Sequence, residues 1–309
     1  MIVLVTGGAG FIGSHIVDRL VARGHPVHIV DNLSTGQLAL VNPVARLHHV
    51  DIRSARLGRV FAEARPDVVV HLAAQMDVRR SVLDPMFDAS VNVIGTLQLL
   101  EQCRRTGVKR VVFASSGGAI YGDGAPIPTS EYEPLRPASP YGVAKLAGER
   151  YIAAWAALTG ATCLALRYAN VYGPRQNPQG EAGVVAIFAS HLLAGEPCVV
   201  YGDGDQTRDY VYVEDVADAT AEAVAQPAAT GVANIGAGVE TTVNELYGRV
   251  AALAGVNPRP THGPPRAGEQ RRSALDASHA KTLLGWAPAT PLDAGLRRTL
   301  DFFRNGLHR

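Results

Sequence analysis

The fold is decided by Thr6-Gly7-Gly8-Ala9-Gly10-Phe11-Ile12-Gly13 near the start of the chain. Two glycine patterns overlap in it, G-x-G-x-x-G from Gly8 and G-x-x-G-x-x-G from Gly7. Only glycine lets a backbone turn tightly and approach a pyrophosphate, whose charge the amides at a helix start then meet. In a chain with 32 Gly among 309 residues, such spacing arises by chance about 0.3 times. Its position between an apolar strand, residues 2–5, and a helix, residues 13–23, therefore carries the interpretation.

Asp31 supports the same interpretation. It lies 18 residues after Gly13, at the end of a second apolar strand, residues 27–30. A carboxylate there suits the ribose hydroxyls of adenosine and repels a 2′-phosphate, which favours NAD over NADP. Asp31-Asn32 followed by Ser34-Thr35-Gly36 is also good turn chemistry, so an ordinary turn is the alternative.

The rest of the first half continues the alternation of strands and helices. Further apolar strands are expected at residues 68–72 and 110–114, with a helix over 88–106 between them. This pattern predicts an α/β fold, a Rossmann-type doubly wound parallel sheet covered on both faces. Beyond about residue 170, frequent Pro and Gly indicate a smaller α/β lobe that binds the substrate. We assign residues 1–170, with returning segments near 209–236, to the NAD-binding domain, and residues 171–208 and 237–309 to the smaller lobe.

Composition excludes several classes of protein. Lys plus Arg is 29 and Asp plus Glu is 28, and this balance argues against a nucleic-acid or anionic-membrane binder. Three widely spaced Cys indicate neither a disulfide framework nor a metal site. No apolar run reaches the roughly 20 residues that cross a bilayer, and the first residues resemble a strand rather than a signal peptide. We therefore expect a soluble cytoplasmic protein without metal, nucleic-acid or membrane partners.

A second motif is Ser139-Pro140-Tyr141-Gly142-Val143-Ala144-Lys145. Ser139 is suited to cap a helix and Pro140 to begin it, which puts Tyr141 and Lys145 on one helical face. An ammonium beside a phenol lowers the phenol pKa toward a value useful for a general base. Ten Tyr and three Lys give this spacing by chance about 0.1 times. The alternative is a surface Tyr beside a solvated Lys.

With both motifs in place, the chain resembles the extended short-chain dehydrogenase/reductases. It is most similar to their NAD-dependent epimerase/dehydratase family, and within that family to the UDP-glucose 4-epimerases. The resemblance spans nearly the whole chain and rests on residues 6–13, 31–36, 71–74, Asn92 with Gly95-Thr96, Ser115-Ser116, Tyr141 with Lys145, residues 167–170 and residues 208–211. It implies NAD as cofactor, a UDP-sugar as substrate bound by the smaller lobe, and a role in nucleotide-sugar and galactose metabolism.

The resemblance implies three catalytic residues, Ser116, Tyr141 and Lys145. Ser116 would bind the sugar O4 and Tyr141 would take its proton. Bound NAD would take the C4 hydride and return it to the opposite face, while Lys145 holds the nicotinamide ribose. Ser115 either shares the role of Ser116 or simply ends a strand. Residues 117–122 contain no Asp or Glu, so a general acid for dehydration is missing there.

The remaining site residues also follow from the resemblance. Expected cofactor contacts are Gly7, Gly10, Phe11, Ile12, Gly13, Asp31, Asn32, Ser34, Gly36, Asp51, Ile52, Leu72, Ala73, Ala74, Asn92, Ser115, Tyr141, Lys145 and Tyr168. Expected substrate contacts are Ser116, Asn170, Val199, Tyr201, Arg208, Arg266, Glu269 and Ser273. Packing is the alternative for Tyr168, and solvated loop charge for Arg208 and Arg266. A small Ser273 leaves room for a 2-acetamido group, so UDP-GlcNAc and UDP-GalNAc are expected as further substrates.

The function expected from the sequence is thus a UDP-hexose 4-epimerase. Alternatives are an NAD-dependent nucleotide-sugar dehydratase, a UDP-glucuronate 4-epimerase, or, from another class, a non-catalytic NAD-sensing protein. Members of the family often pair as homodimers through two helices each. Here these would be the segments 88–106 and 141–158, the second of which is rich in Ala.

Overall fold

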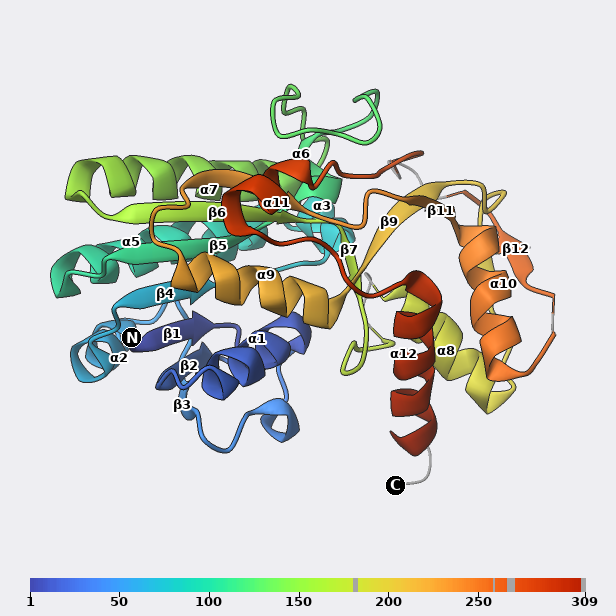
Figure 1. Ribbon diagram of the computed structural model, residues 1–309, viewed down its shortest axis with the longest axis horizontal. Coiled ribbons are helices and arrows are strands. Elements are labelled where there is room, and N and C mark those ends of the chain that lie inside the picture. Colours follow the sequence, from blue (N-terminus) through green and yellow to red (C-terminus); the bar gives the residue numbers. More distant parts are fainter. Residues whose placement is uncertain (180–182, 258, 266–269, 307–309) are drawn as a thin grey trace.

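The computed structural model describes residues 1–179, 183–257, 259–265 and 270–306, and its larger part is built on one parallel sheet (Figure 1). The strands are β1 (Val3–Thr6), β2 (Val27–Asp31), β3 (Arg46–His49), β4 (Val68–His71), β5 (Arg110–Ser116), β6 (Thr162–Tyr168) and β10 (Gly231–Ile235). They lie in the order β10-β6-β5-β4-β1-β2-β3, and all neighbours are parallel. The chain reverses direction across the sheet between β1 and β4. This is the doubly wound arrangement, so the predicted fold class is confirmed.

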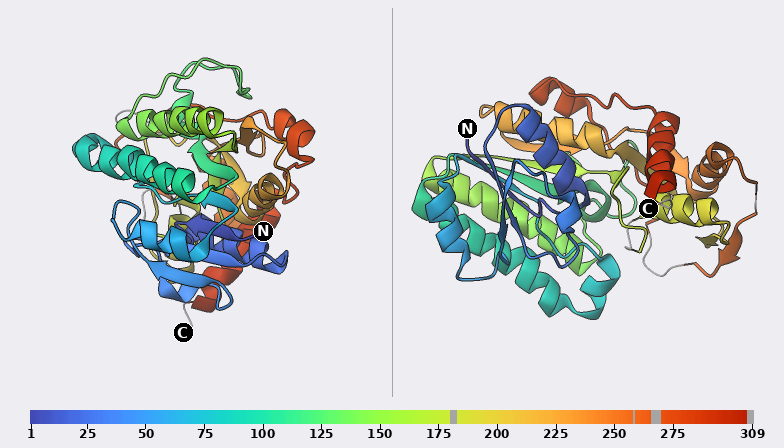
Figure 2. Two further views of the ribbon diagram at one scale, coloured as in Figure 1. Left: turned by 90° about the vertical axis from the view of Figure 1, so that its left-hand side faces the viewer. Right: turned by 90° about the horizontal axis from the view of Figure 1, so that it is seen from below.

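Helices cover both faces of this sheet, which explains why β1 and β4 at its centre are apolar up to their last residue. Every residue of β1 and β4 is buried. One face packs against α1 (Phe11–Ala22), α9 (Val213–Ala225) and α11 (Ser278–Leu284). The other face packs against α2 (Leu57–Ala64), α5 (Gly95–Thr106) and α7 (Pro140–Thr159). Figure 2 shows the two layers end-on. Each fully buried Leu or Val contributes about 1.5–3 kcal/mol.

The segment predicted as one helix over residues 88–106 is interrupted. After α3 (Val78–Leu83), the chain forms α4 (Pro85–Ala89), then a π-helical turn η2 (Ser90–Ile94), and then α5. Asp77 and Asp84 are the N-caps of α3 and α4. Their carboxylates accept hydrogen bonds from the backbone N–H groups of Arg80 and Phe87, respectively. A π turn shifts the helical spacing, so it re-aims the side chain of Asn92.

The smaller part has its own sheets and core. β7 (Asn170–Tyr172), β9 (Thr207–Tyr212) and β11 (Glu240–Thr242) form one sheet, and β8 (Val199–Tyr201) pairs with β12 (Thr261–Gly263). Helices α8 (Val184–Ala194), α10 (Val243–Ala254) and α12 (Leu292–Gly306) pack around them, at the right of Figure 1. The chain returns to the large sheet through α9 and β10. β9, although inside the predicted returning segment, belongs to the smaller sheet.

Two short helices complete the description, η1 (Leu38–Leu40) and α6 (Gly117–Ile120), the second directly after β5. Among the described residues, none of the helices combines the length and the apolar character needed to cross a bilayer.

Candidate active site

The glycine-rich turn joins β1 to α1 and lies against the end of β4. Gly7 has φ +73°, a conformation that other residues rarely adopt. A Cβ at Gly7 would lie 2.9 Å from the backbone N of Ala73, and one at Gly13 would lie 2.0 Å from the carbonyl O of Gly7. Gly10 starts α1 without a capping side chain. This close-packed turn with an uncapped helix start fits the pyrophosphate of a dinucleotide.

Asp31 holds the turn together from the end of β2. Its buried carboxylate accepts hydrogen bonds from the backbone N–H groups of Ala9, at 3.0 Å, and Leu33, at 2.8 Å. A Cβ at Gly36 would lie 2.8 Å from Asp31 Oδ1, so this glycine also permits a close approach. An ionised carboxylate has about four acceptor positions. The turn contacts and a ribose contact are therefore compatible at the same side chain.

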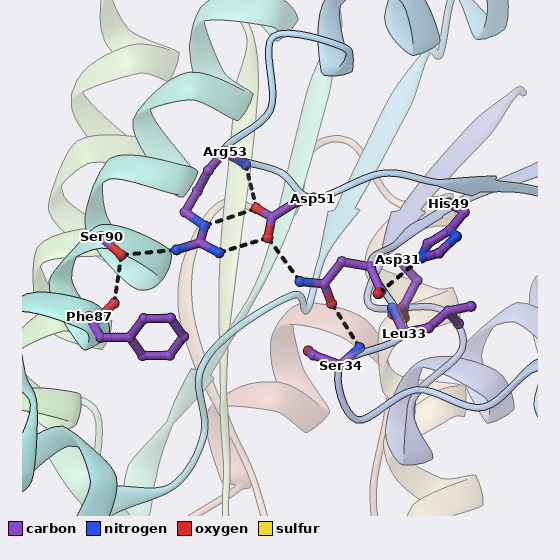
Figure 3. A network of polar contacts seen from close by, with 9 residues as sticks. Asp31, Leu33, Ser34, His49, Asp51, Arg53, Phe87 and Ser90 are labelled. Carbon is purple, nitrogen blue, oxygen red and sulfur yellow. Dashed lines mark hydrogen bonds and ion pairs between the residues drawn. The ribbon is translucent and has the colours of Figure 1, made fainter.

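A polar network lies beside the end of β2 (Figure 3). Asn32 Nδ2 donates to Asp51 Oδ2 at 2.9 Å, and Asn32 Oδ1 accepts from the backbone N–H of Ser34 at 3.0 Å. Arg53 donates to both oxygens of Asp51, at 2.9 and 2.8 Å. These bonds hold the pKa of Asp51 well below its usual range. Three of the residues predicted to contact the cofactor thus meet in one charged, ordered cluster.

The π turn η2 fixes the loop that follows β4. Asn92 Nδ2 donates to the carbonyl O of Gln75, and Asn92 Oδ1 accepts from the N–H of Gln75, both at 2.9 Å. Asp88 Oδ1 accepts from Asn92 Nδ2 and Gln75 Nε2, also at 2.9 Å. This loop carries the predicted cofactor residues Leu72, Ala73 and Ala74, all of them half-buried. Asp88, only 1% exposed, was missed from the sequence, although it precedes Asn92 by one helical turn.

His71 ends β4 inside a chain of hydroxyl groups. Its Nδ1 lies 2.7 Å from Thr6 Oγ1, and its Nε2 lies 2.9 Å from Thr96 Oγ1. Thr96 Oγ1 donates its proton to the carbonyl O of Asn92, so Nε2 of His71 must be the donor. Nδ1 therefore accepts from Thr6 and carries no proton. Thr6 Oγ1 also accepts from the backbone N–H groups of Leu72 and Ala73, which ties the histidine to the cofactor turn.

Stability is expected to fall as pH falls below 6.5, partly because of His71. Burial lowers the pKa of His71 to about 3, so between pH 6.5 and 3 the unfolded chain binds a proton that the folded chain rejects. Each pH unit in that window then costs about 1.4 kcal/mol for one such group. The check is urea unfolding at pH 7, 6 and 5 for the wild type and for His71→Gln. In His71→Gln the free energy of unfolding should fall less steeply with falling pH than in the wild type, by the contribution of one proton. Equal slopes in the two proteins would contradict the view that His71 is buried without a proton.

The helix that carries Tyr141 and Lys145 begins as predicted. Ser139 Oγ accepts from the N–H of Gly142 at 3.1 Å, and Pro140 is the first helical residue. A Cβ at Gly142 would lie 2.4 Å from the carbonyl O of Ala119. The first turn of α7 is therefore pressed against the segment that follows β5.

Ser116, Tyr141 and Lys145 meet at this junction. Ser116, the last residue of β5, acts on the Tyr141 hydroxyl as a hydrogen-bonding neighbour that lowers its pKa. Lys145 Nζ donates to the carbonyl O of Ala114 at 2.8 Å and lies 5.8 Å from the centre of the Tyr141 ring. It also lies 5.0 Å from the centre of the Phe113 ring. The structure brings together the three residues predicted to be catalytic.

Burial, rather than Lys145, dominates the ionisation of Tyr141. Burial raises the pKa of Tyr141 to about 12, while the bond with Ser116 lowers it and the charge of Asp88 raises it. Burial also lowers the pKa of Lys145 to about 8, against the charges of Asp88 and Glu149. The prediction that Lys145 lowers the Tyr141 pKa is therefore wrong for this arrangement. The spacing of the two residues did not reveal that Lys145 is buried and Tyr141 half-buried.

Two residues predicted to contact the cofactor have other hydrogen-bond partners in the structure. Ser115 Oγ donates to Glu149 Oε1 at 2.5 Å, so its hydroxyl proton is committed away from the role of Ser116. Tyr168 Oη bonds to Thr220 Oγ1 of α9 at 2.8 Å, and its ring lies in the core under that helix. These contacts favour packing, the alternative given for Tyr168.

The predicted substrate residues come from several elements of the smaller part. Asn170 begins β7, with Oδ1 3.8 Å from where a Cβ of Gly118 would lie. β7 pairs with β9, which carries Arg208, and Arg208 Nη1 donates to the carbonyl O of Thr207 at 2.7 Å. Val199 and Tyr201 are exposed at the two ends of β8. Arg266 and Glu269 lie outside the described residues.

Asp209 helps to hold residues 273–276 near the end of β5. This fully buried carboxylate accepts from the N–H groups of Ala237, Gly238 and Leu275, at 2.8, 3.1 and 3.1 Å. A Cβ at Gly117 would lie 2.5 Å from the side chain of Leu275. Ser273, 7% exposed, is two residues away. Asp209 was not predicted, although it directly follows Arg208 in a segment that carried the resemblance.

Comparison with known proteins agrees with the family resemblance seen in the sequence. The model of the NAD dependent epimerase/dehydratase family matches residues 3–236. The chain is 49% identical over 308 residues to the UDP-glucose 4-epimerase of Mycolicibacterium smegmatis, covering 98% of both. A crystal structure of UDP-glucose 4-epimerase with UDP-glucose from Thermotoga maritima superposes with TM-score 0.96, at 47% identity over 99% of this chain and 100% of that one. The UDP-glucose 4-epimerase of Thermus thermophilus in complex with NAD gives TM-score 0.93, at 46% identity over 98% and 99%.

Proposed function

The chain belongs to the NAD dependent epimerase/dehydratase family, and from that premise we propose that it is a UDP-hexose 4-epimerase. Its substrates are UDP-glucose and UDP-galactose, with UDP-GlcNAc and UDP-GalNAc as further ones. The observation that carries the proposal is the meeting of Ser116, Tyr141 and Lys145 at the carboxyl end of β5, on the same edge of the parallel sheet as the glycine turn after β1. Similarity to UDP-glucose 4-epimerases over nearly the full chain supports the choice of sugar nucleotide.

Each group at the site then has a task. When bound, NAD supplies a reversible hydride acceptor, so no outside reductant is consumed. The turn of Gly7, Gly10 and Gly13 holds its pyrophosphate and Asp31 its adenosine ribose. Ser116 positions the sugar O4, and Tyr141 Oη takes the O4 proton and later returns it.

The surroundings of the site favour epimerisation over dehydration. Residues 117–122 carry no acid, and the two buried carboxylates near Lys145 are already engaged. Asp88 is bonded to Gln75 and Asn92, and Glu149 to Ser115 and Arg167. Among these described residues, no carboxyl group is therefore left to donate a proton to a departing sugar hydroxyl. A protein that only senses NAD has no use for a phenol whose pKa is adjusted by a neighbouring serine.

The deciding experiment is a product assay on purified protein without added NAD. UDP-glucose, UDP-GlcNAc and UDP-glucuronate are supplied separately, and product mass and C4 configuration are measured. Unchanged mass with inverted C4 on the hexoses supports the proposal. Loss of water, or turnover of UDP-glucuronate alone, would assign the enzyme to one of the two alternatives within the family. No product from any sugar would leave the NAD-sensing alternative.

Ser273→Tyr is expected to lower activity on UDP-GlcNAc relative to UDP-glucose by about tenfold, or ~1.4 kcal/mol of discrimination. The large ring would fill the space that a 2-acetamido group needs, while an unsubstituted hexose loses less. Initial rates on the two sugars measure the ratio. Ser273→Ala is the control and should keep it, since the side chain stays small. An unchanged ratio in Ser273→Tyr would remove this residue from sugar selection.

We further propose that the enzyme is a cytoplasmic homodimer. Apolar side chains are exposed on α3, α4, η2 and α7, namely Val82, Leu83, Met86, Ile94, Val143, Tyr151 and Leu158. A second copy of this face would cover them. Free thiols at Cys103, Cys163 and Cys198 suit a reducing compartment. Light scattering at twice the chain mass of 32.6 kDa would support the dimer.

A further inference from the structure

A buried ion pair lies beside the end of β5, the strand that carries Ser115 and Ser116. Ser115, the neighbour of Ser116, donates to Glu149 Oε1 at 2.5 Å. Arg167 of β6 donates two hydrogen bonds to the same carboxylate, from Nε to Oε1 at 2.9 Å and from Nη2 to Oε2 at 2.7 Å. The Arg167 and Glu149 side chains are 3% and 4% exposed. Since Glu149 follows Lys145 by one turn of α7, the pair ties β5, β6 and the catalytic helix together.

Tyr121 extends this contact toward the smaller part. Arg167 Nη1 donates to Tyr121 Oη at 2.9 Å, and Tyr121 Oη donates to Asn234 Oδ1 at 2.8 Å. Because a guanidinium can only donate, Tyr121 Oη accepts from Arg167 and must donate to Asn234, so the direction of each of these hydrogen bonds is fixed. Asn234 Nδ2 then donates to the carbonyl groups of Thr129, at 2.9 Å, and Asp276, at 3.2 Å.

The far end of the chain is the segment that contains Ser273. Thr129 pairs with this segment through two backbone bonds, its N–H to the carbonyl O of Ala274 and its carbonyl O to the N–H of Asp276, both at 2.8 Å. Leu275, between them, packs on Gly117 beside Ser116. The segment is thus linked to the end of β5 in two ways, by packing on Gly117 directly after the strand and by the polar bonds that run through Asn234, Tyr121 and Arg167.

We propose that Ser115, Glu149, Arg167, Tyr121 and Asn234 form a positioning device for the reaction, an inference that rests on the proposed function. Ser115 and Glu149 hold the end of β5 so that Ser116 faces Tyr141. Tyr121 sets the distance from the catalytic residues to segment 273–276, against which the sugar lies. Apolar side chains of the same volume would pack equally well. Directed bonds, by contrast, fix the angle as well as the distance.

Two variants separate the two ends of the device. Ser115→Ala keeps the Glu149–Arg167 pair but frees the catalytic strand, and it is expected to lower kcat about tenfold with KM for UDP-glucose nearly unchanged. Tyr121→Phe loosens segment 273–276 and is expected to raise KM about fivefold with a smaller effect on kcat. Tyr172→Phe is the matched control, because it also loses a buried tyrosine hydroxyl bond, to Leu292 O at 3.1 Å, outside the device. Both of its kinetic constants should stay near those of the wild type.

Amide hydrogen exchange tests the same device without any turnover. In Tyr121→Phe, the amides of Thr129 and Asp276 should exchange at least about tenfold faster, and in Tyr172→Phe they should not. A wild type that turns over no sugar while this exchange difference is present would refute the proposed function and support the device. An active wild type, with equal exchange in both variants or with kcat and KM changed no more than in Tyr172→Phe, would overturn the device alone.

Discussion

Tyr141→Phe is expected to lower kcat about 10³-fold while NAD remains bound, because general acid–base catalysis by one side chain is worth roughly that much. The substitution removes only the hydroxyl, the group whose pKa Ser116 lowers. The ring keeps its place above Lys145, and the glycine turn and Asp31 are unchanged. The measurements are kcat on UDP-glucose and the NAD content of the purified variant. A variant with nearly full activity would show that Tyr141 is not the base.

The pH dependence of kcat sharpens the same test. Burial raises the pKa of Tyr141 to about 12, and the bond with Ser116 works in the opposite direction. Ser116→Ala removes that bond, so the rise of kcat with pH should move further toward alkaline values than in the wild type. Tyr172→Phe, a control far from Ser116, should leave the profile where it is. Unaltered profiles in both variants would mean that Ser116 does not assist the ionisation of Tyr141.

Local sequence was sufficient for much of the larger part. Strands such as Val3–Thr6 and Val68–His71 are buried on both faces, so an apolar run identifies them without knowledge of their neighbours. The start of α7 was also predictable, because the Ser139 cap and Pro140 act within one turn of chain. The turn at Gly7 follows from backbone geometry alone. In all of these, the signal that identifies the element lies within a few residues of the motif.

What the sequence did not reveal depends on contacts between distant residues. The pKa of Tyr141 depends on burial by the folded chain, which the spacing to Lys145 does not report. The π turn around Asn92 depends on the loop at Gln75, 17 residues earlier. Tyr121 and Asn234 are 113 residues apart. A partnership of this kind leaves no periodic signal in the chain, so the device behind β5 became visible only in the fold.

Arg110→Met is expected to destabilise the protein by about 3 kcal/mol or more. Arg110 is 2% exposed, and its guanidinium donates to four oxygens. These are the carbonyl oxygens of Ala223, Pro227 and Ala229, at 2.8, 3.0 and 2.7 Å, and Thr162 Oγ1 at 3.0 Å. Burial lowers its pKa to about 10, so it stays charged at neutral pH. Methionine fills the volume but leaves these buried acceptors without donors.

The three carbonyl oxygens lie where α9 ends and the chain turns into β10, the edge strand of the large sheet, while Thr162 begins β6. The partial negative charge of a helix C-terminus favours a cation at this point. Urea unfolding measures the effect, and Arg297→Met, an exposed position on α12, is the control for loss of charge alone, with an expected change within about 0.5 kcal/mol. Equal midpoints for the two variants would contradict the prediction. If it holds, β10 should also exchange its amide hydrogens faster than β1 in Arg110→Met, because the guanidinium fastens this edge of the sheet to the helix that leads into it.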